Sequence, residues 1–281
     1  MFIRLGYDLQ FYVPAPLSFV AQLHVHPSRV ADLREPDVVH LEGDIPSHEY
    51  SDTFGNLCTR FVAPAGNLRI HNSTLIYDSG LPDPEAHDVP EVPIDQLPDD
   101  VLRFLLASRY CEVDLLSPIA LDLFGHLPKG GNRVHAIVEW CNQKVKFGYA
   151  YARSTKTALD VYTERLGVCR DYPHLAVTFC RALNIPARYV AGYLGDIGVA
   201  YTTPMDFSAW FEAYLDGKWW TFDARHNHPR VGRVLMATGR DAADVAFLTS
   251  FGGSTLTKFE VTSDEVPDPD HPDDFVPTPL S

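Results

Sequence analysis

The pattern of hydrophobic and polar positions changes character along the chain. Up to about residue 80 it is typical of β-strands. Residues 57–62 and 68–76 are rich in strand-forming side chains, and turn-forming residues precede each run. We therefore expect residues 1–80 to form an antiparallel, β-rich amino-terminal region.

From about residue 99 the apolar positions recur at helical spacing. A first helix is predicted to begin at Asp99 or Asp100. A second covers residues 133–146, where apolar side chains fall at i, i+3, i+4 and i+7. A third covers residues 169–183 and ends there, because the following Ile185-Pro186 cannot continue a helix.

Strands are predicted to follow the third helix, over residues 187–194, 208–215 and 219–223. The last two are joined at Asp216-Gly217, a strong signal for a two-residue hairpin loop. A short helix near residues 241–248 and a closing strand near 256–261 complete the pattern. Helices followed by a mostly antiparallel sheet predict the α+β class for residues 101–261.

The net charge of −14 is concentrated in two proline-rich segments. Residues 81–100 contain seven acidic residues and residues 262–281 contain six, and neither segment has a Lys or Arg. Such sequence buries too little apolar surface to order itself. We interpret residues 81–100 as a linker and 262–281 as a flexible tail, with an acidic docking site as the alternative. Without a basic stripe, nucleic-acid binding is not expected.

The remaining composition indicates a protein of a reducing compartment. No stretch approaches the roughly 18 apolar residues of a membrane span, and the first residues lack the pattern of a secretory signal. The five cysteines are odd in number and show no C-x-x-C spacing, which argues against a disulfide scaffold or a zinc site. We expect a cytoplasmic protein without membrane partners.

Cys169 is the cysteine with a physical reason to be reactive. It is predicted to open the third helix, where unpaired backbone N–H groups and the helix dipole favour thiolate over thiol. The neighbouring Arg170 adds a positive charge. The other cysteines are interpreted as buried, inert thiols; they are Cys58, Cys111, Cys141 and Cys180.

The hairpin predicts where an orienting carboxylate lies. If Asp216-Gly217 is the whole loop, the numbers of opposing residues sum to 433, and Asp223 becomes the diagonal neighbour of position 208 on the same face. Diagonal neighbours are about 7–8 Å apart. A base at position 208 would then be oriented by Asp223, whereas a three-residue loop would destroy the arrangement.

Several phrases resemble the core of the bacterial transglutaminase-like superfamily. Gly167, Cys169 and Asp171 match its G-x-C-x-D phrase, residues 184–193 (NIPARYVAGY) match its strand phrase, and Asp223 closes a W-x-x-x-D phrase. The β-rich first 80 residues also resemble bacterial members. The resemblance implies a papain-like α+β core, a Cys–His–Asp triad and no metal or other cofactor. It assigns Arg170, Asp171 and Trp210 to the substrate or oxyanion region.

One position departs from this family pattern. Members carry the triad histidine in an H-A-W or H-x-W phrase, but this sequence has Ser208-Ala209-Trp210. A serine hydroxyl is no base at neutral pH. The triad therefore reads Cys169–Ser208–Asp223, without the base whose contribution is typically about 10²–10⁴ in rate.

Several residues are candidates to replace that base. His226 and His228 follow Asp223, and a loop there could fold an imidazole back toward the thiol. His174 lies about 140° around the helix from Cys169 and is expected to point away. Asp171 or Asp223 acting through a water held by Ser208 is a further alternative. The sequence does not choose among them.

Two weaker candidates concern other chemistry. His24-Val25-His26 would place two imidazoles on one strand face, but without a third ligand we interpret it as a solvated face and predict no metal site. Ser208 as a nucleophile lacks the turn of a G-x-S-x-G motif.

The resemblance implies an enzyme in which Cys169 attacks an amide or ester carbonyl. The resulting thioester is resolved by water, as in a cysteine protease or amidase, or by an amine, as in an acyltransferase. Its partner is a peptide or protein substrate, or a small amide. The alternatives are a pseudoenzyme that binds a peptide or glutamine-like group in the inherited cleft, and a redox-sensitive or modified thiol.

Overall fold

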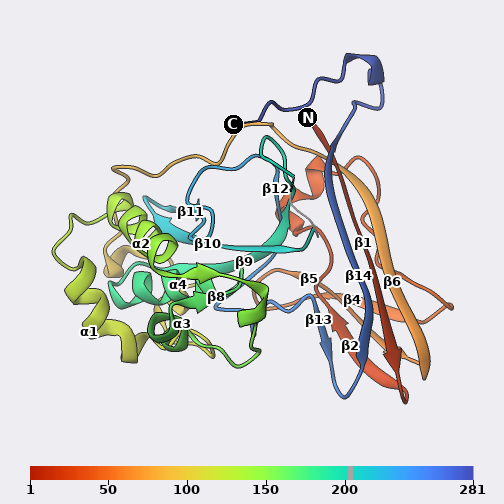
Figure 1. The fold of residues 1–281 in the computed structure, drawn as a ribbon, viewed down its shortest axis with the longest axis horizontal. Coiled ribbons are helices and arrows are strands. Elements are labelled where there is room, and N and C mark those ends of the chain that lie inside the picture. Colours follow the sequence, from red (N-terminus) through yellow and green to blue (C-terminus); the bar gives the residue numbers. More distant parts are fainter. Residues whose placement is uncertain (202–204, 281) are drawn as a thin grey trace.

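The computed structural model describes residues 1–201 and 205–280 and shows two lobes. In Figure 1 a lobe built of long strands lies on the right, and a lobe of helices and a second sheet lies on the left. The lobes share a hydrophobic core, because Tyr193, Phe207 and Val234 of the helical lobe pack among the buried residues of the strand lobe. The candidate site lies beside these residues, near the end of the strand that contains Tyr193 and the start of the strand that follows Phe207.

The strand lobe is a sandwich of two antiparallel sheets. Along β1 (Phe2–Val13) the side chains of Ile3, Leu5 and Leu9 are buried, while Arg4 and Asp8 between them are partly exposed, as expected for a strand with one face on the core. One sheet has the order β14 (Thr255–Val266), β1, β6 (Gly66–Tyr77) and β3 (His40–Leu41); the other has β13 (Leu248–Ser250), β2 (Leu17–Ala21), β5 (Leu57–Ala63) and β4 (Ser47–Ser51).

The carboxyl-terminal strand belongs to this sandwich, which corrects the expected boundaries. β14 pairs along β1 from Phe2↔Val266 to Tyr12↔Thr255. The strand expected at residues 256–261 therefore extends to Val266, outside the helical lobe, and takes in the start of the segment interpreted as a flexible tail. Strand pairing between the two ends of a chain leaves no local sequence signal.

The helical lobe has the predicted α+β architecture. Its sheet has the order β11 (Lys218–Phe222), β10 (Ser208–Leu215), β9 (Ala187–Leu194) and β12 (Arg233–Gly239). Helix α4 (Asp171–Ala182) packs on β9 and β10, and it in turn contacts α1 (Val113–Phe124), α2 (Gly131–Lys144) and α3 (Ala158–Glu164). Phe211 and Phe222 face the helices and stack on each other with ring centroids 5.6 Å apart.

The hairpin has the predicted register. Leu215 pairs with Lys218 and Phe211 with Phe222, so that paired residue numbers sum to 433 and the loop is Asp216-Gly217 alone. Both loop residues have positive φ, 48° and 79°, as a two-residue hairpin turn of the primed type requires. This confirms the premise from which the position of Asp223 was predicted.

Two helix predictions differ from the structure, and two helices were not predicted. The helix expected near Asp99 is a 3-10 helix, Leu102–Leu105, because the i, i+3 spacing of its buried Val101 and Phe104 suits that helix equally. The helix expected at residues 241–248 is a turn, in which the Asp241 carboxylate accepts backbone N–H groups of Ala243 and Tyr110. Helices α1 and α3 were not predicted.

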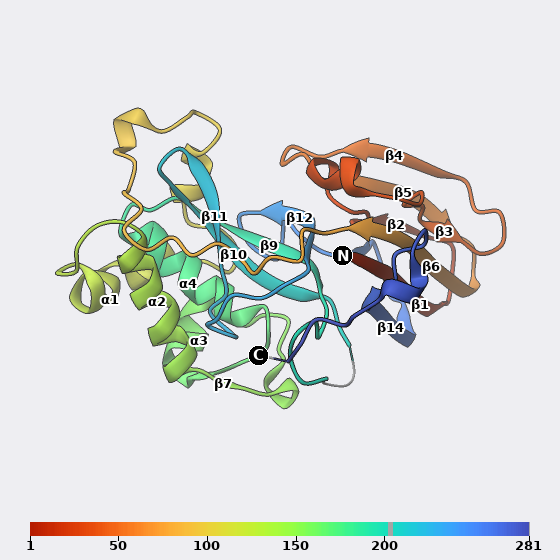
Figure 2. The same cartoon turned by 90° about the horizontal axis from the view of Figure 1, so that it is seen from above.

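The acidic segment 81–100 is held against the lobes at a few points, although most of its side chains are exposed. Figure 2 shows the chain after β6 crossing from the sandwich to the helical lobe. Ala86 is buried, Val89 accepts the N–H of Gly131 (2.8 Å), and a Cβ at Gly131 would lie 1.6 Å from the carbonyl oxygen of Ala86. The sequence could not show which residues of the folded lobes bind this segment. The main example is Asp83, whose carboxylate accepts hydrogen bonds from Arg230 and Arg233.

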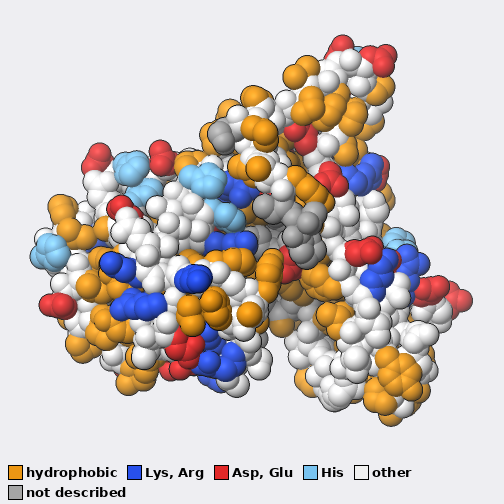
Figure 3. All heavy atoms as spheres, viewed as in Figure 1, with side chains coloured by type: hydrophobic (Ala, Val, Ile, Leu, Met, Phe, Trp, Pro, Cys, Tyr) orange, Lys and Arg blue, Asp and Glu red, His pale blue; other side chains and the backbone are white. Residues whose placement is uncertain are grey.

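Charged side chains are dispersed over the surface. On the face drawn in Figure 3, Lys and Arg side chains stand singly or in small groups among acidic, apolar and uncharged ones. Within the described ranges, no helix has the length and apolar character needed to cross a bilayer.

Candidate active site

Cys169 lies in a tight turn that leads into α4. Strand β8 (Leu166–Gly167) ends just before it, and the fully buried Asp171 carboxylate accepts the backbone N–H of Val168 at 2.9 Å. A Cβ at Gly167 would lie 2.9 Å from the Cβ of Asp171, so the glycine permits the close approach. Cys169 is partly exposed, whereas the other four cysteines are buried. Its placement makes it the accessible thiol.

The thiol opens into a small cavity that gathers several of the predicted residues. The cavity has a volume of about 50 Å³ and is lined by Cys169, Ser208 and His226, among others. Asp206, Arg225 and Tyr149 complete its charged and polar wall next to the thiol. The structure therefore brings together the cysteine, the serine that departs from the family pattern and one of the candidate replacement bases.

His226 is held by Asp223 through the loop that follows β11. One carboxylate oxygen, Oδ1, accepts the backbone N–H groups of Arg225 and His226, each at 2.9 Å, which turns the chain back on itself. The other oxygen, Oδ2, lies 2.8 Å from Nδ1 of His226. Since a carboxylate only accepts hydrogen bonds, Nδ1 carries the proton and Nε2 carries the lone pair.

Asp223 is ionised in this environment. Its side chain is 4% exposed, and burial alone would raise its pKa. Arg233 opposes that effect, because its Nη2 donates to Oδ2 of Asp223 at 2.7 Å; together with His226 it holds the pKa of the carboxyl well below its usual range. The carboxylate is thus an anion at neutral pH.

The thiol is harder to ionise than the sequence indicated. The pKa of Cys169 is raised to about 11, chiefly by burial and then by the nearby Asp206, against the opposing effects of Arg225 and the backbone N–H of Arg170. The Arg170 guanidinium lies over the ring of Tyr110 and donates to the carbonyl oxygen of Arg153. The expected depression of the thiol pKa by the helix start and Arg170 is therefore wrong, because burial dominates.

Trp210 and His174 do not line the thiol cavity. Trp210 is buried beneath the guanidinium of Arg233 (5.0 Å) and lines a separate groove of about 600 Å³ between the lobes. His174 is fully buried between the rings of Tyr110 and Tyr189, and its Nε2 accepts the N–H of Ala242. His174 is thus enclosed within the fold and does not face the thiol.

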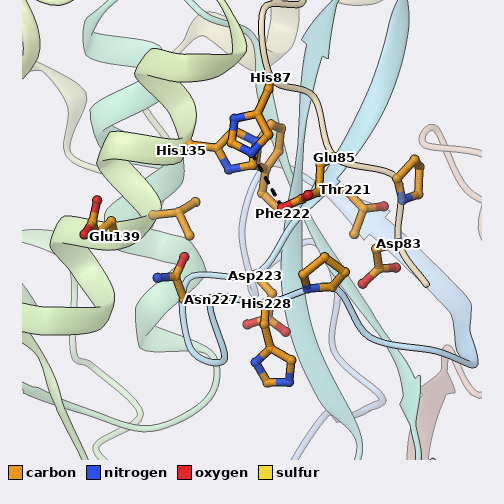
Figure 4. A pocket seen from close by; sticks show the side chains of 13 residues that line it. Asp83, Glu85, His87, His135, Glu139, Thr221, Phe222, Asp223, Asn227 and His228 are labelled. Carbon is orange, nitrogen blue, oxygen red and sulfur yellow. Dashed lines mark ion pairs between the residues drawn. The ribbon is translucent and has the colours of Figure 1, made fainter. Parts of the chain in front are cut away.

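His228 lines a different cavity from that of the thiol. Its Nδ1 is 2.9 Å from the carbonyl oxygen of His226, and it lines a cavity of about 250 Å³ drawn in Figure 4. Asp223 lies between this cavity and His226. Of the three candidate replacement bases, only His226 lines the cavity of the thiol.

The His24-Val25-His26 pair serves structural roles. His24 is buried, which corrects the expected solvated face, and its Nε2 lies 2.8 Å from the hydroxyl of Thr59. His26 caps the 3-10 helix Pro27–Asp32 by accepting the N–H of Ser28. Among the described residues no group of three or more metal-ligating side chains is placed to hold an ion.

Sequence reasoning missed the charged residues around the triad positions. Asp83 is remote from Asp223 along the chain, and Arg233 lies on the strand at the opposite edge of the sheet, so no pattern linked either of them to Asp223. Arg225 and Asp206 adjoin motifs but carried no sign of facing the thiol. His226 had a local signal, because an Asp followed three residues later by His can form the turn in which the carboxylate accepts both backbone N–H groups.

The comparisons with known proteins cover the whole chain. Residues 120–224 match the profile of the transglutaminase-like superfamily. The crystal structure of a "putative cysteine protease" from Cytophaga hutchinsonii is 31% identical, covers 100% of this chain and 94% of that one, and superposes with a TM-score of 0.83. An uncharacterized protein from Mycobacterium leprae is 26% identical over 227 residues, covering 76% of this chain and 80% of that protein.

Proposed function

The chain belongs to the transglutaminase-like superfamily, and we propose that it cleaves or transfers acyl groups through a thioester at Cys169, with His226 as the base. The observation that carries the proposal is the placement of one imidazole. His226 is hydrogen-bonded to the ionised Asp223 and lines the same small cavity as the thiol. The base of this protein would thus come from the loop after β11 rather than from position 208.

Ser208 has a simple role in this proposal. It opens β10 and lines the cavity shared by Cys169 and His226. A histidine at position 208 would have to share that cavity, of about 50 Å³, with the imidazole that enters from position 226. A small side chain leaves the space free, which supports the two positions as alternatives for one base.

The proposed reaction begins with both partners neutral. Because the pKa of Cys169 is raised to about 11, the resting thiol keeps its proton. As the sulfur attacks the carbonyl carbon of an amide or ester, Nε2 of His226 takes that proton, and Asp223 stabilises the imidazolium. We assign the backbone N–H groups at the start of α4 to the developing oxyanion.

His226 then returns the proton to the leaving amine or alcohol as the tetrahedral intermediate collapses to a thioester. Attack on the thioester by water gives hydrolysis, and attack by an amine gives acyl transfer, with His226 again removing the proton. The similarity to a protein described as a cysteine protease supports a peptide or protein substrate. A cytoplasmic location stays a prediction from the sequence.

Point variants and a model ester test the proposal. We expect Cys169→Ala to abolish hydrolysis of p-nitrophenyl acetate and the acetylated protein seen by mass spectrometry after acid quenching. His226→Asn should reduce the rate by about 10²–10⁴. His228→Asn is the matched control, because this neighbouring imidazole does not line the thiol cavity, and its rate should stay within about threefold of wild type.

The double variant Ser208→His with His226→Asn tests whether the two positions are alternatives. A recovery of about tenfold or more over His226→Asn would support one base site reachable from either position. Full activity in His226→Asn would assign the base elsewhere. Absence of an acetylated Cys169 in the wild-type protein would favour the pseudoenzyme alternative.

A further inference from the structure

Arg233 reaches the hydrogen-bonded pair of Asp223 and His226, called the dyad below, from the opposite edge of the sheet. It begins β12, whereas Asp223 follows β11, and β9 and β10 lie between them. The guanidinium passes over the ring of Trp210, and its Nη2 donates to Oδ2 of Asp223 at 2.7 Å. Gly192 keeps this path open, since an added Cβ would lie 2.7 Å from Trp210 and 2.2 Å from the carbonyl oxygen of Val234.

Arg233 is itself held by Asp83, from the acidic segment between the lobes. Oδ2 of Asp83 accepts Nε of Arg233 at 2.6 Å and the backbone N–H of Arg230 at 2.9 Å. The segment is anchored there, because the N–H of Asp83 also donates to the carbonyl oxygen of Arg230 at 2.9 Å. Figure 4 shows the carboxylates of Asp83 and Asp223 around the same cavity.

These contacts form a line of alternating charge that ends at the base. It runs from the Asp83 carboxylate through the Arg233 guanidinium to the Asp223 carboxylate and then to His226. The same oxygen of Asp223 binds both Arg233 and His226. Because the positive charge of Arg233 partly neutralises that oxygen, the oxygen stabilises an imidazolium at His226 less strongly.

We propose that Arg233 and Asp83 are positioning residues that set the pH range in which His226 acts as the base. The inference rests on the function proposed above and states in which direction each of the two residues affects the base. Arg233 weakens the stabilisation that Asp223 gives to the imidazolium formed during the reaction, and Asp83 partly cancels this effect of Arg233. The segment that joins the lobes thereby contributes to the chemistry of the site.

Other charged groups face His226 and act in every variant. Those lining its cavity are Tyr149, Cys169, Asp196, Asp206, Arg225 and Arg230. The ring of His228 lies 6.1 Å from that of His226. Because these groups stay unchanged when Arg233 or Asp83 is replaced, they fix the absolute position of the pH profile and not the differences between variants.

The experiment compares pH–rate profiles for hydrolysis of p-nitrophenyl acetate. In Arg233→Met we expect the acidic limb to move up by about one pH unit, because Asp223 then stabilises the imidazolium more strongly. In Asp83→Asn we expect the limb to move down, by about half a unit. Arg233→Lys keeps the charge and should restore a limb close to that of wild type.

Arg188→Met is the matched control. Arg188 lines the same interlobe groove as Arg233 but pairs with Glu212 (2.6 Å) and lies over Trp219, away from the dyad. Its limb should coincide with that of wild type. A purely structural role for Arg233 and Asp83 would lower the plateau of the profiles without moving their limbs in opposite directions.

Limbs that coincide, or that shift in the same direction in Arg233→Met and Asp83→Asn, would overturn the proposal. If Arg233→Met does not fold, the downward shift in Asp83→Asn and the restoration in Arg233→Lys still decide it. The failure of the proposed function looks different. It would appear as activity retained in Cys169→Ala or His226→Asn, whereas unmoved limbs with both of those variants inactive would reject the positioning role alone.

Discussion

The ionisation of Cys169 provides the most direct test of how its surroundings act on the thiol. Burial raises the pKa of the thiol from an ordinary value of 9.0 to about 11, with Asp206 as the second contribution and Arg225 opposing both. A difference of two units corresponds to about 3 kcal/mol and a hundredfold loss of thiolate. At pH 7 only about one molecule in 10⁴ would then hold a thiolate.

The measurement is carbamidomethylation of Cys169 by iodoacetamide, followed by mass spectrometry between pH 7 and 10. It is made in the His226→Asn background, so that the base does not assist the attack. We expect alkylation at pH 7 to be about a hundredfold slower than that of a small thiol, and its rate to rise tenfold per pH unit without a plateau.

Replacing two neighbouring charged residues should change the alkylation rate of Cys169 in opposite directions. Asp206→Asn removes a carboxylate that disfavours the thiolate, so alkylation should accelerate, whereas Arg225→Met should slow it. The four buried cysteines serve as internal references within each sample. A plateau below pH 8.5, or a change in the same direction in both variants, would refute the conclusion that burial dominates the ionisation of this thiol.

Three further predictions concern stability, measured by urea unfolding. Gly131→Ala should lower the unfolding free energy by at least 1–3 kcal/mol, because its Cβ would lie 1.6 Å from the carbonyl oxygen of Ala86; an unchanged midpoint would show that residues 81–100 are not packed on α2. Thr157→Ala removes the capping box of α3 and should cost about 1 kcal/mol, and no loss would exclude that cap. Asp223→Asn removes one of the two carboxylates that pair with the buried Arg233, Asp83 being the other, and should cost at most about 3–5 kcal/mol at pH 7. Since the pKa of Asp223 is lowered in the folded state, its contribution is complete above the unfolded pKa near 4, and the difference from Asn should shrink as the pH falls below that value; a difference independent of pH would contradict the ionic origin.

Much of the fold could be predicted because its signals are local. The third helix, the strands on either side of Asp216-Gly217 and their register follow from side-chain periodicity and turn chemistry within a few residues. The weaker predictions fell where one spacing suits two structures, as at Val101 and Phe104. They also fell where a side chain competes for backbone hydrogen bonds, as Asp241 does.

In the candidate site, too, the features with local sequence signals could be predicted and the others could not. The position of Cys169 before a helix and of Asp223 beside the hairpin could be derived from the sequence, and so could the absence of a histidine at position 208. That His226 lines the thiol cavity, and His174 and His228 do not, required the folded loop, because all three histidines were near enough along the chain to be candidates.

The amino-acid sequence by itself determined the elements, the hairpin register and the residues capable of the chemistry, since periodicity and turn preference act over a few neighbouring positions. Only the tertiary structure decided that β14 completes the amino-terminal sandwich, that Arg233 crosses the sheet to Asp223 and that Asp83 holds Arg233. It also decided that Cys169 lies where burial raises the pKa of its thiol to about 11. Burial and charge at a site depend on segments brought together from distant parts of the chain, and no local pattern records which segments will meet.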